Sequence, residues 1–277
     1  MNTFRPRPFA NIPPVLKNLL IINILMFLAF IVLRGTMNIN LNQILGLYYF
    51  KSEYFRPYQI VTYMFMHGNF QHILLNMFML WMFGRVLEQV WGGKRFLIYY
   101  FFTALGAAAI HMLVLHLELG PMIRDAAAFR NTPSPELFDF FIKDYIGRPT
   151  EQVIAFIRTW DTDPGNSSYA DQAILMVENW MNAPGSGINV PTVGASGAIF
   201  GILLAFGMIF PNMPLMLIFL PMFPIKAKYM VIGMCVIELI AGLAWSGSNI
   251  AHFAHLGGAL FGFILIKYWN TSRQDFY

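Results

Sequence analysis

Long runs of hydrophobic residues alternate with short polar segments along most of the chain. Six of these runs approach the roughly 20 residues that an α-helix needs to cross the hydrocarbon core of a bilayer. They lie at about residues 15–33, 72–91, 96–117, 196–222, 229–245 and 250–269. The pattern therefore predicts an all-α polytopic membrane protein with six transmembrane helices.

The fourth run is interrupted by prolines, which cannot lie inside one undisturbed helix. A helix that begins at Ser196 has only about 15 residues before Pro211, so it is too short to cross a bilayer alone. If this helix ends at the inner face, Ser196 lies several ångströms below the outer face. Irregular backbone at that depth is tolerated only around a water-filled cavity, so we expect a submerged but hydrated serine.

The segment between the third and fourth runs, about residues 118–190, is too long for a plain connection. Ser134-Pro135-Glu136 has the composition of a helix start, and Thr150 is placed to cap a second helix. A third helix is expected at Ala170–Met181. The prediction is one membrane domain, residues 1–277, which carries a helical insertion subdomain at residues 118–190 on its extracytoplasmic side.

Composition agrees with a membrane protein, since 57% of the residues are hydrophobic, 12% are charged and the mean hydropathy is +0.55. If the N-terminus is inside, the inner loops hold ten Lys and Arg residues and the short outer loops hold three. The ten are Arg5, Arg7, Lys17, Arg85, Lys94, Arg95, Lys226, Lys228, Lys267 and Arg273, and the three are Arg34, Lys51 and Arg56. We expect an integral protein of the bacterial inner membrane with both termini cytoplasmic. The net charge of +4 is attributed to this orientation, and no nucleic-acid partner is expected.

Two polar groups in these runs suit hydrolytic chemistry. Ser196 lies in Gly194-Ala195-Ser196-Gly197 at the start of the fourth run, and His255 lies in the sixth. A serine nucleophile needs a base within hydrogen-bond reach. His252, one turn earlier than His255, is the competing candidate for that base.

Small residues explain how these two helices could meet. Gly197 and Gly201 form a small-xxx-small face on the fourth run, and Gly258 and Gly262 form one on the sixth. Such faces let membrane helices approach closely. Because His255 lies one turn before Gly258, this register favours His255 over His252 as the base.

The second run begins with His67 and contains His72 and Asn76, which are four residues apart and share a helix face. Polar groups inside a membrane are costly unless they have partners or a function. Stabilising the oxyanion of acyl transfer requires donors fixed in advance. His72 and Asn76 are therefore candidates for an oxyanion hole.

These motifs together resemble the rhomboid family of intramembrane serine proteases. They read HxxxxHxxxN at His67–Asn76, GxSG at Gly194–Gly197 and AHxxGxxxG at Ala254–Gly262. The resemblance implies a six-helix rhomboid fold that cleaves membrane-anchored proteins near the outer face. It also implies Ser196 as nucleophile, His255 as base, and His72, Asn76 and the Ser196 N–H as oxyanion donors. Glu88 matches an acid of the family that is expected to be structural.

The chain departs from this pattern in its first outer loop. Many relatives carry Trp-Arg where Tyr58-Gln59 stands here, so the charge that fixes that loop is either absent or supplied by Arg56. The insertion between the third and fourth helices is also longer than in the simplest members of the family.

Several residues have alternative interpretations. Glu238, the acid within the fifth run, could complete a triad with His255, but the resemblance implies a dyad, and a buried carboxyl can instead donate a hydrogen bond between helices. His67 is expected to fix the entry to the second helix, whereas His111 and His116 are expected at the membrane interface. Cys235 is expected to serve packing.

No cofactor and no metal site are expected, because HExxH is absent and no carboxylate accompanies the histidines of the second and sixth runs. The expected partners are membrane-anchored protein substrates and the lipid bilayer, and the sequence leaves the oligomeric state open. The main alternative function is a catalytically silent rhomboid-like protein that binds client transmembrane helices.

Overall fold

The computed structural model describes residues 12–185, 187–217, 220–244 and 252–271. Arg5, Arg7 and Arg273, which contributed to the predicted orientation, lie outside the described residues.

The chain divides into two compact units. The first comprises Met1–Leu47, Arg56–His111 and Pro191–Tyr277, and the second comprises Tyr48–Phe55 and Met112–Val190.

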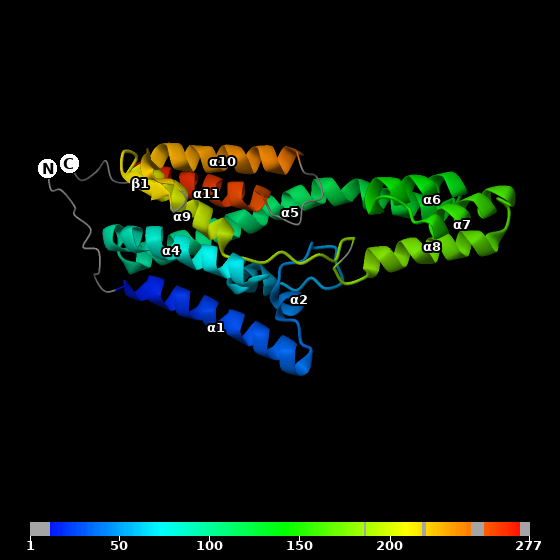
Figure 1. Cartoon of the computed structure of the whole chain (residues 1–277), viewed down its shortest axis with the longest axis horizontal. Helices are drawn as coiled ribbons and strands as arrows, with labels where there is room; N and C mark the ends of the chain where they lie inside the picture. Colours follow the sequence, from blue (N-terminus) through cyan, green and yellow to red (C-terminus); the bar gives the residue numbers. More distant parts are fainter. Residues whose placement is uncertain (1–11, 186, 218–219, 245–251, 272–277) are drawn as a thin grey trace. The chain divides into compact units, whose positions relative to one another are not determined.

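The first unit is built from long apolar helices (Figure 1). By length and composition, four helices of the described residues can cross a membrane: α1 (Pro14–Met37), α4 (Phe70–Trp91), α5 (Gly93–Asn131) and α10 (Ala227–Ala244). The unit also contains α9 (Ser196–Ile209) and α11 (His252–Thr271), together with the short helices α2 (Leu41–Leu45), α3 (Gln59–Thr62) and η1 (Tyr63–Phe65). The all-α polytopic membrane fold is confirmed, while the count of six transmembrane helices stays a prediction.

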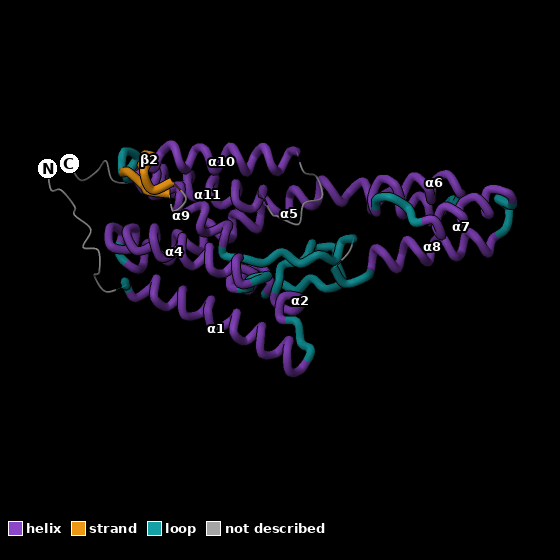
Figure 2. The backbone as a smooth tube through the Cα atoms, in the orientation of Figure 1, coloured by secondary structure: helices purple, strands orange, loops and turns teal. Residues whose placement is uncertain are grey.

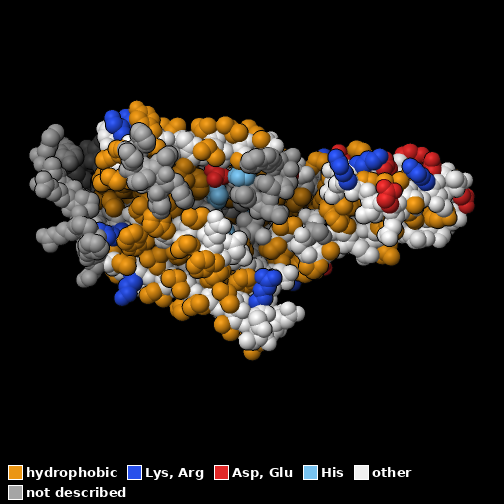
Figure 3. Space-filling model, in the orientation of Figure 1, with side chains coloured by type: hydrophobic (Ala, Val, Ile, Leu, Met, Phe, Trp, Pro, Cys, Tyr) orange, Lys and Arg blue, Asp and Glu red, His pale blue; other side chains and the backbone are white. Residues whose placement is uncertain are grey.

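Hydrophobic side chains form broad patches on the visible surface of this unit (Figure 3). On α1, Leu25 and Val32 are more than half exposed, and on α10 the same holds for Ile237 and Leu243. Helices satisfy their own backbone hydrogen bonds, so an apolar helix can present such side chains directly to lipid. The exposed faces are therefore suited to a bilayer.

Helix α9 lies at the centre of the first unit and contacts α4, α10 and α11. Most of its residues are buried, because it is apolar all round and surrounded by other helices. It begins at Ser196 and ends at Ile209, before Pro211. The predicted short helix is confirmed.

The segment after α9 is a two-stranded antiparallel hairpin (Figure 2). Strand β1 (Pro214–Leu217) pairs with β2 (Leu220–Lys226), with Pro214 opposite Lys226. The sequence analysis ended the helix of the fourth hydrophobic run before Pro211, but it did not predict that the rest of this run, to residue 222, contributes to two strands. Proline is excluded from a helix interior but tolerated in a hairpin, where each strand has one edge that needs no hydrogen bond.

Glu88, near the end of α4, fixes the start of α1. Its carboxylate accepts hydrogen bonds from the backbone N–H groups of Val15 at 3.0 Å and Leu16 at 2.7 Å. The N-cap of α1, Pro13, provides no side-chain hydrogen bond. An acid at a helix N-terminus satisfies unpaired amides and interacts favourably with the helix dipole. Glu88 therefore has the structural role that the resemblance implied.

The second unit is a helical bundle. It contains α6 (Pro135–Phe141), the π-helix η2 (Ile142–Ile146), α7 (Glu151–Thr162), α8 (Ser167–Asn182) and the C-terminal part of α5. The two predicted caps are confirmed, because Ser134 accepts from the Leu137 N–H and Thr150 from the Val153 N–H.

The boundaries of the remaining helices in this unit differ from the prediction. Helix α8 starts at Ser167, where Asn166 is the cap, rather than at Ala170. Helix α5 continues through Pro121 to Asn131 instead of ending near residue 117. A proline inside a helix removes one hydrogen bond, and the packing of Met122 and Phe129 into the core offsets that loss.

Aromatic side chains form the core of the second unit. Phe129, Phe138, Phe141 and Trp160 are all at most 2% exposed and come from α5, α6 and α7. The apolar faces of these helices therefore pack against one another. The placement of residues 118–190 on the extracytoplasmic side stays a prediction.

Candidate active site

Ser196 is the first residue of α9 and follows an extended segment that is hydrogen-bonded to the segment between α1 and α4. The backbone of Thr192 forms a bridge with Leu47, and the Gly194 N–H donates to the Tyr63 carbonyl oxygen at 3.0 Å. Gly194 has φ = 131°, which L side chains rarely adopt. A glycine is therefore required directly before the serine turn.

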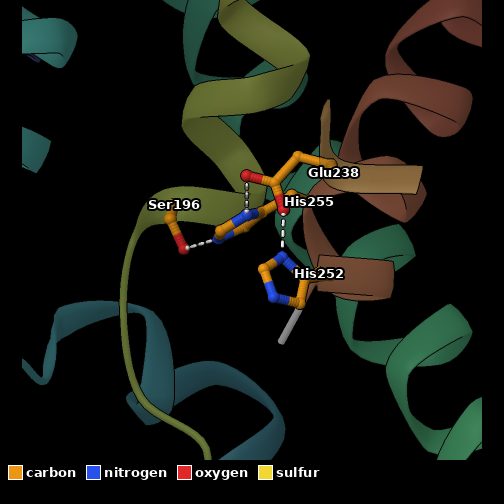
Figure 4. Close-up of polar contacts among 4 residues, drawn as sticks. All are labelled: Ser196, Glu238, His252 and His255. Carbon is orange, nitrogen blue, oxygen red and sulfur yellow. Dashed lines mark hydrogen bonds and ion pairs between the residues drawn. The ribbon is translucent and has the colours of Figure 1, made fainter. Parts of the chain in front are cut away.

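His255, on the first turn of α11, contacts Ser196 as predicted (Figure 4). The distance between His255 Nε2 and Ser196 Oγ is 2.7 Å. The imidazole lies flat against the Phe200 ring, with 4.5 Å between ring centroids and 4° between ring planes. Since Phe200 lies one turn after Ser196 on α9, the same helix positions the serine and holds the orientation of the histidine ring.

The predicted glycine faces make this contact possible. A Cβ atom on Gly258 would collide with the Gly197 carbonyl, and one on Gly262 would lie 3.2 Å from the Gly201 Cα. On the other side of α9, a Cβ on Gly201 would lie 2.6 Å from the Thr103 side chain of α5. The backbones of α9 and α11 are therefore in direct contact, and this close packing brings His255 within reach of Ser196.

His72 lies on the first turn of α4 and faces the serine turn. A Cβ atom built on Gly194 would lie 2.9 Å from His72 Nε2 and 3.5 Å from Ser196 Oγ, so both groups converge on this glycine. His72 Nδ1 accepts from the Gly68 N–H at 3.5 Å. This contact favours the tautomer that carries its proton on Nε2, where it can be donated toward the site.

Asn76, one turn further along α4, is 6% exposed. Its Nδ2 has no hydrogen-bond partner among the described residues. A buried polar group without a partner costs roughly 1–3 kcal/mol. An amide donor kept unpaired in this position is suited to an oxygen atom of a bound substrate.

Glu238, on α10, reaches both histidines of α11 (Figure 4). Its Oε2 lies 2.6 Å from His252 Nδ1, within a hydrogen bond, and its Oε1 lies 3.1 Å from His255 Nδ1. The second contact lacks hydrogen-bond geometry, and it becomes an ion pair only when His255 is protonated. Among the described residues, no group of three or more His, Cys, Asp or Glu side chains could hold a metal ion.

His67 lies in the loop that enters α4. Its side chain is fully buried and meets the His72 ring edge-on, with centroids 5.1 Å apart, and its carbonyl accepts from Asn42 Nδ2 at 3.1 Å. Burial lowers the pKa of the His67 imidazole to about 3, so the ring is neutral at physiological pH. These contacts support the role in fixing the helix entry.

His111 lies inside the first unit, and its predicted place at the membrane interface stays a prediction. The side chain is only 9% exposed, and its Nε2 lies 2.6 Å from Thr192 Oγ1 in the segment that leads to Ser196. This contact joins residues far apart in the chain, so no local pattern could have indicated it. His116 belongs to the second unit, where its Nδ1 lies 2.9 Å from the Tyr49 hydroxyl.

Gln59, which follows Tyr58 in the segment between α1 and α4, is 1% exposed. Its Nε2 donates to the Ile44 carbonyl at 3.1 Å, and its Oε1 accepts from the Arg56 N–H at 3.0 Å. A neutral amide thus joins two parts of the segment between α1 and α4. The sequence analysis singled out Gln59 for the charge that it lacks, and the structure adds the hydrogen bonds that its amide makes.

Comparison with known proteins shows a match to one family over most of the chain. The family model of the rhomboid domain matches residues 54–122 and 172–270, more than half of the chain. The presenilin-associated rhomboid-like protein, mitochondrial, of Bos taurus is 41% identical over 78 residues, 28% of this chain and 20% of that protein. Its Homo sapiens counterpart is 40% identical over the same length, with the same coverage.

A chloroplast protein is also similar. Rhomboid-like protein 11, chloroplastic, of Arabidopsis thaliana is 40% identical over 58 residues, 21% of each chain. The matched segments therefore span about a fifth of the length of these curated relatives.

Proposed function

Because the chain belongs to the rhomboid family, we propose that it is an intramembrane serine endopeptidase that hydrolyses peptide bonds in or near the transmembrane segments of membrane-anchored proteins. The observation that carries the proposal is the 2.7 Å contact between His255 Nε2 and Ser196 Oγ. It joins a nucleophile and a base from two apolar helices, which fits a reaction at membrane depth.

Acylation begins when His255 Nε2 takes the proton of the Ser196 hydroxyl. The Ser196 oxygen forms a bond to the carbonyl carbon of the substrate, and the carbonyl electron pair moves to its oxygen. His72 Nε2–H, Asn76 Nδ2–H and the Ser196 N–H donate to this oxyanion. The C–N bond then breaks as His255 returns the proton to the leaving nitrogen.

Deacylation repeats these steps with water. His255 removes a proton from a water molecule, whose oxygen attacks the acyl carbon. The bond to Ser196 Oγ breaks, and the serine recovers its proton from His255. The short α9 supports this step, because a helix of 14 residues cannot span a bilayer, so Ser196 is expected below the membrane surface, where a water-filled cavity could supply the water.

Labelling by a serine-reactive fluorophosphonate tests the activity directly. The detergent-solubilised protein is expected to be labelled, and Ser196→Ala is expected to lose the label, because only a serine with a base and oxyanion donors attacks phosphorus at a useful rate. Ser168→Ala, an exposed serine of α8, is the control that keeps the label. A folded wild type that resists labelling would favour a catalytically silent protein that binds client helices.

We also propose that both termini face the cytoplasm across a bacterial inner membrane, with residues 118–190 on the outer side. The distribution of Lys and Arg supports this orientation. In a Cys235→Ala background, a membrane-impermeant thiol reagent applied to intact spheroplasts is expected to label Gln152→Cys in α7 and to spare Asn270→Cys in α11. Both positions are exposed, so the opposite pattern would contradict the orientation.

A further inference from the structure

Glu238 is an ionisable residue in the middle of an apolar transmembrane helix. It is the sole acid in the sequence of α10, and its side chain is only 16% exposed. Ionisable groups at membrane depth are costly unless they are paired, and they usually mark a function. The catalytic steps proposed for Ser196 and His255 do not use Glu238.

Both carboxylate oxygens of Glu238 are directed at imidazole nitrogens of α11 (Figure 4). Oε2 contacts His252 Nδ1 at 2.6 Å and Oε1 contacts His255 Nδ1 at 3.1 Å. His255 in turn contacts Ser196 through its other nitrogen. Glu238, His255 and Ser196 therefore form a continuous chain of contacts across three helices.

We propose that Glu238 is a positioning residue for the reaction, which acts through His255 and converts the Ser196-His255 dyad into a Ser-His-Glu arrangement. This inference rests on the proposed protease function and goes beyond the dyad that the family resemblance implies. Glu238 does not touch the substrate and does not receive the serine proton.

The first effect of Glu238 is on the tautomer of His255. A carboxylate can only accept hydrogen bonds, so the proton of neutral His255 is favoured on Nδ1, beside Oε1. Nε2 then carries the lone pair that accepts the Ser196 hydroxyl proton. With the opposite tautomer, Nε2 would already be protonated and could not act as a base.

The second effect is electrostatic. Proton transfer from Ser196 leaves His255 as an imidazolium, and a carboxylate 3.1 Å away stabilises that charge. The interaction is stronger in a poorly solvated site than in water. In the free protein the His255 Nδ1–H bond does not point directly at Glu238 Oε1. Catalytic hydrogen bonds often align only when the substrate binds.

His252 holds the carboxylate in place for this task. Its short hydrogen bond to Oε2 fixes one oxygen of Glu238 and leaves Oε1 for His255. Phe200 stacks on the His255 ring and holds its plane, so both partners of the Glu238–His255 contact are supported by neighbouring side chains. His252, the alternative candidate for the base, therefore positions Glu238 instead.

The test compares kcat, KM and melting temperature for cleavage of a single-span reporter by Glu238→Gln, Glu238→Asp and the wild type. Glu238→Gln is expected to lower kcat by about a hundredfold with little change in KM, because one amide oxygen must serve two imidazole N–H groups and the charge is lost. Glu238→Asp keeps the charge and is expected to recover part of the rate. Glu88→Gln is the matched control, since it also removes a buried carboxylate charge and is expected to affect only the melting temperature.

A Glu238→Gln variant whose kcat stays within about threefold of the wild type would overturn the proposal, whatever its melting temperature. Glu238→Asp with a lower kcat than Glu238→Gln would also overturn it, because the charge would then be irrelevant. Both results leave the protease function intact, since the wild type still cleaves the reporter. A wild type that is folded but inactive would overturn both proposals.

Discussion

Cleavage of a single-span reporter is expected to be abolished by Ser196→Ala and by His255→Ala, with a loss of about 10⁴-fold or more. Ser196 forms the covalent bond to the substrate, and its proton must reach His255 Nε2 at 2.7 Å. The loss should appear in kcat, because alanine removes an interaction that is needed only during the reaction. The measurement is single-turnover cleavage in liposomes, with insertion verified for each variant.

His252→Ala is the matched control for the base. It lies one turn before His255 on α11 and contacts Glu238 rather than the serine. We expect this variant to lose less than about tenfold in rate, through a less firmly held carboxylate. An inactive His252→Ala together with an active His255→Ala would show that the base is wrongly assigned.

The second large effect concerns the oxyanion donors of α4. Loss of one donor costs on the order of 3 kcal/mol, so His72→Ala and Asn76→Ala should each lower kcat about a hundredfold while KM changes little. The basis is that His72 Nε2 lies beside the serine turn and Asn76 Nδ2 is buried without a partner among the described residues. The rate of fluorophosphonate labelling should fall in parallel, since phosphonylation of Ser196 uses the same donors.

Asn23→Ala provides the control for removal of a buried amide. Asn23 lies within α1 and donates to the Leu19 carbonyl at 2.8 Å, so this change is expected to alter the melting temperature and leave the labelling rate of folded protein unchanged. If His72→Ala and Asn76→Ala both kept near-normal kcat, these side chains would not form the oxyanion hole.

The sequence by itself determined the features that depend on near neighbours. The positions of α1, α4 and α10 follow from apolar runs, and the short α9 follows from Pro211. The caps at Ser134 and Thr150 are local hydrogen bonds between residues three apart. Each of these outcomes depends on one continuous stretch of chain, so residue type and spacing are sufficient.

The sequence also indicated the meeting of Ser196 and His255, which are far apart in the chain. Here the register of Gly197 and Gly201 against Gly258 and Gly262 supplied a geometric reason, because glycine marks the faces where helices touch. The resemblance to a known family supplied the roles of His72 and Asn76. These roles remain predictions, and the structure contributes the distances on which they rest.

Only the tertiary structure decided which other polar groups lie near Ser196 and His255. Glu238, His111 and Gln59 find partners on other helices or loops, and those contacts depend on how each helix is rotated about its axis. A shift of one residue turns a helical side chain by about 100°, so hydropathy cannot specify which polar atoms meet. The rotation is fixed by close packing of the whole unit, and for that reason the contacts of Glu238 become visible only in the folded chain.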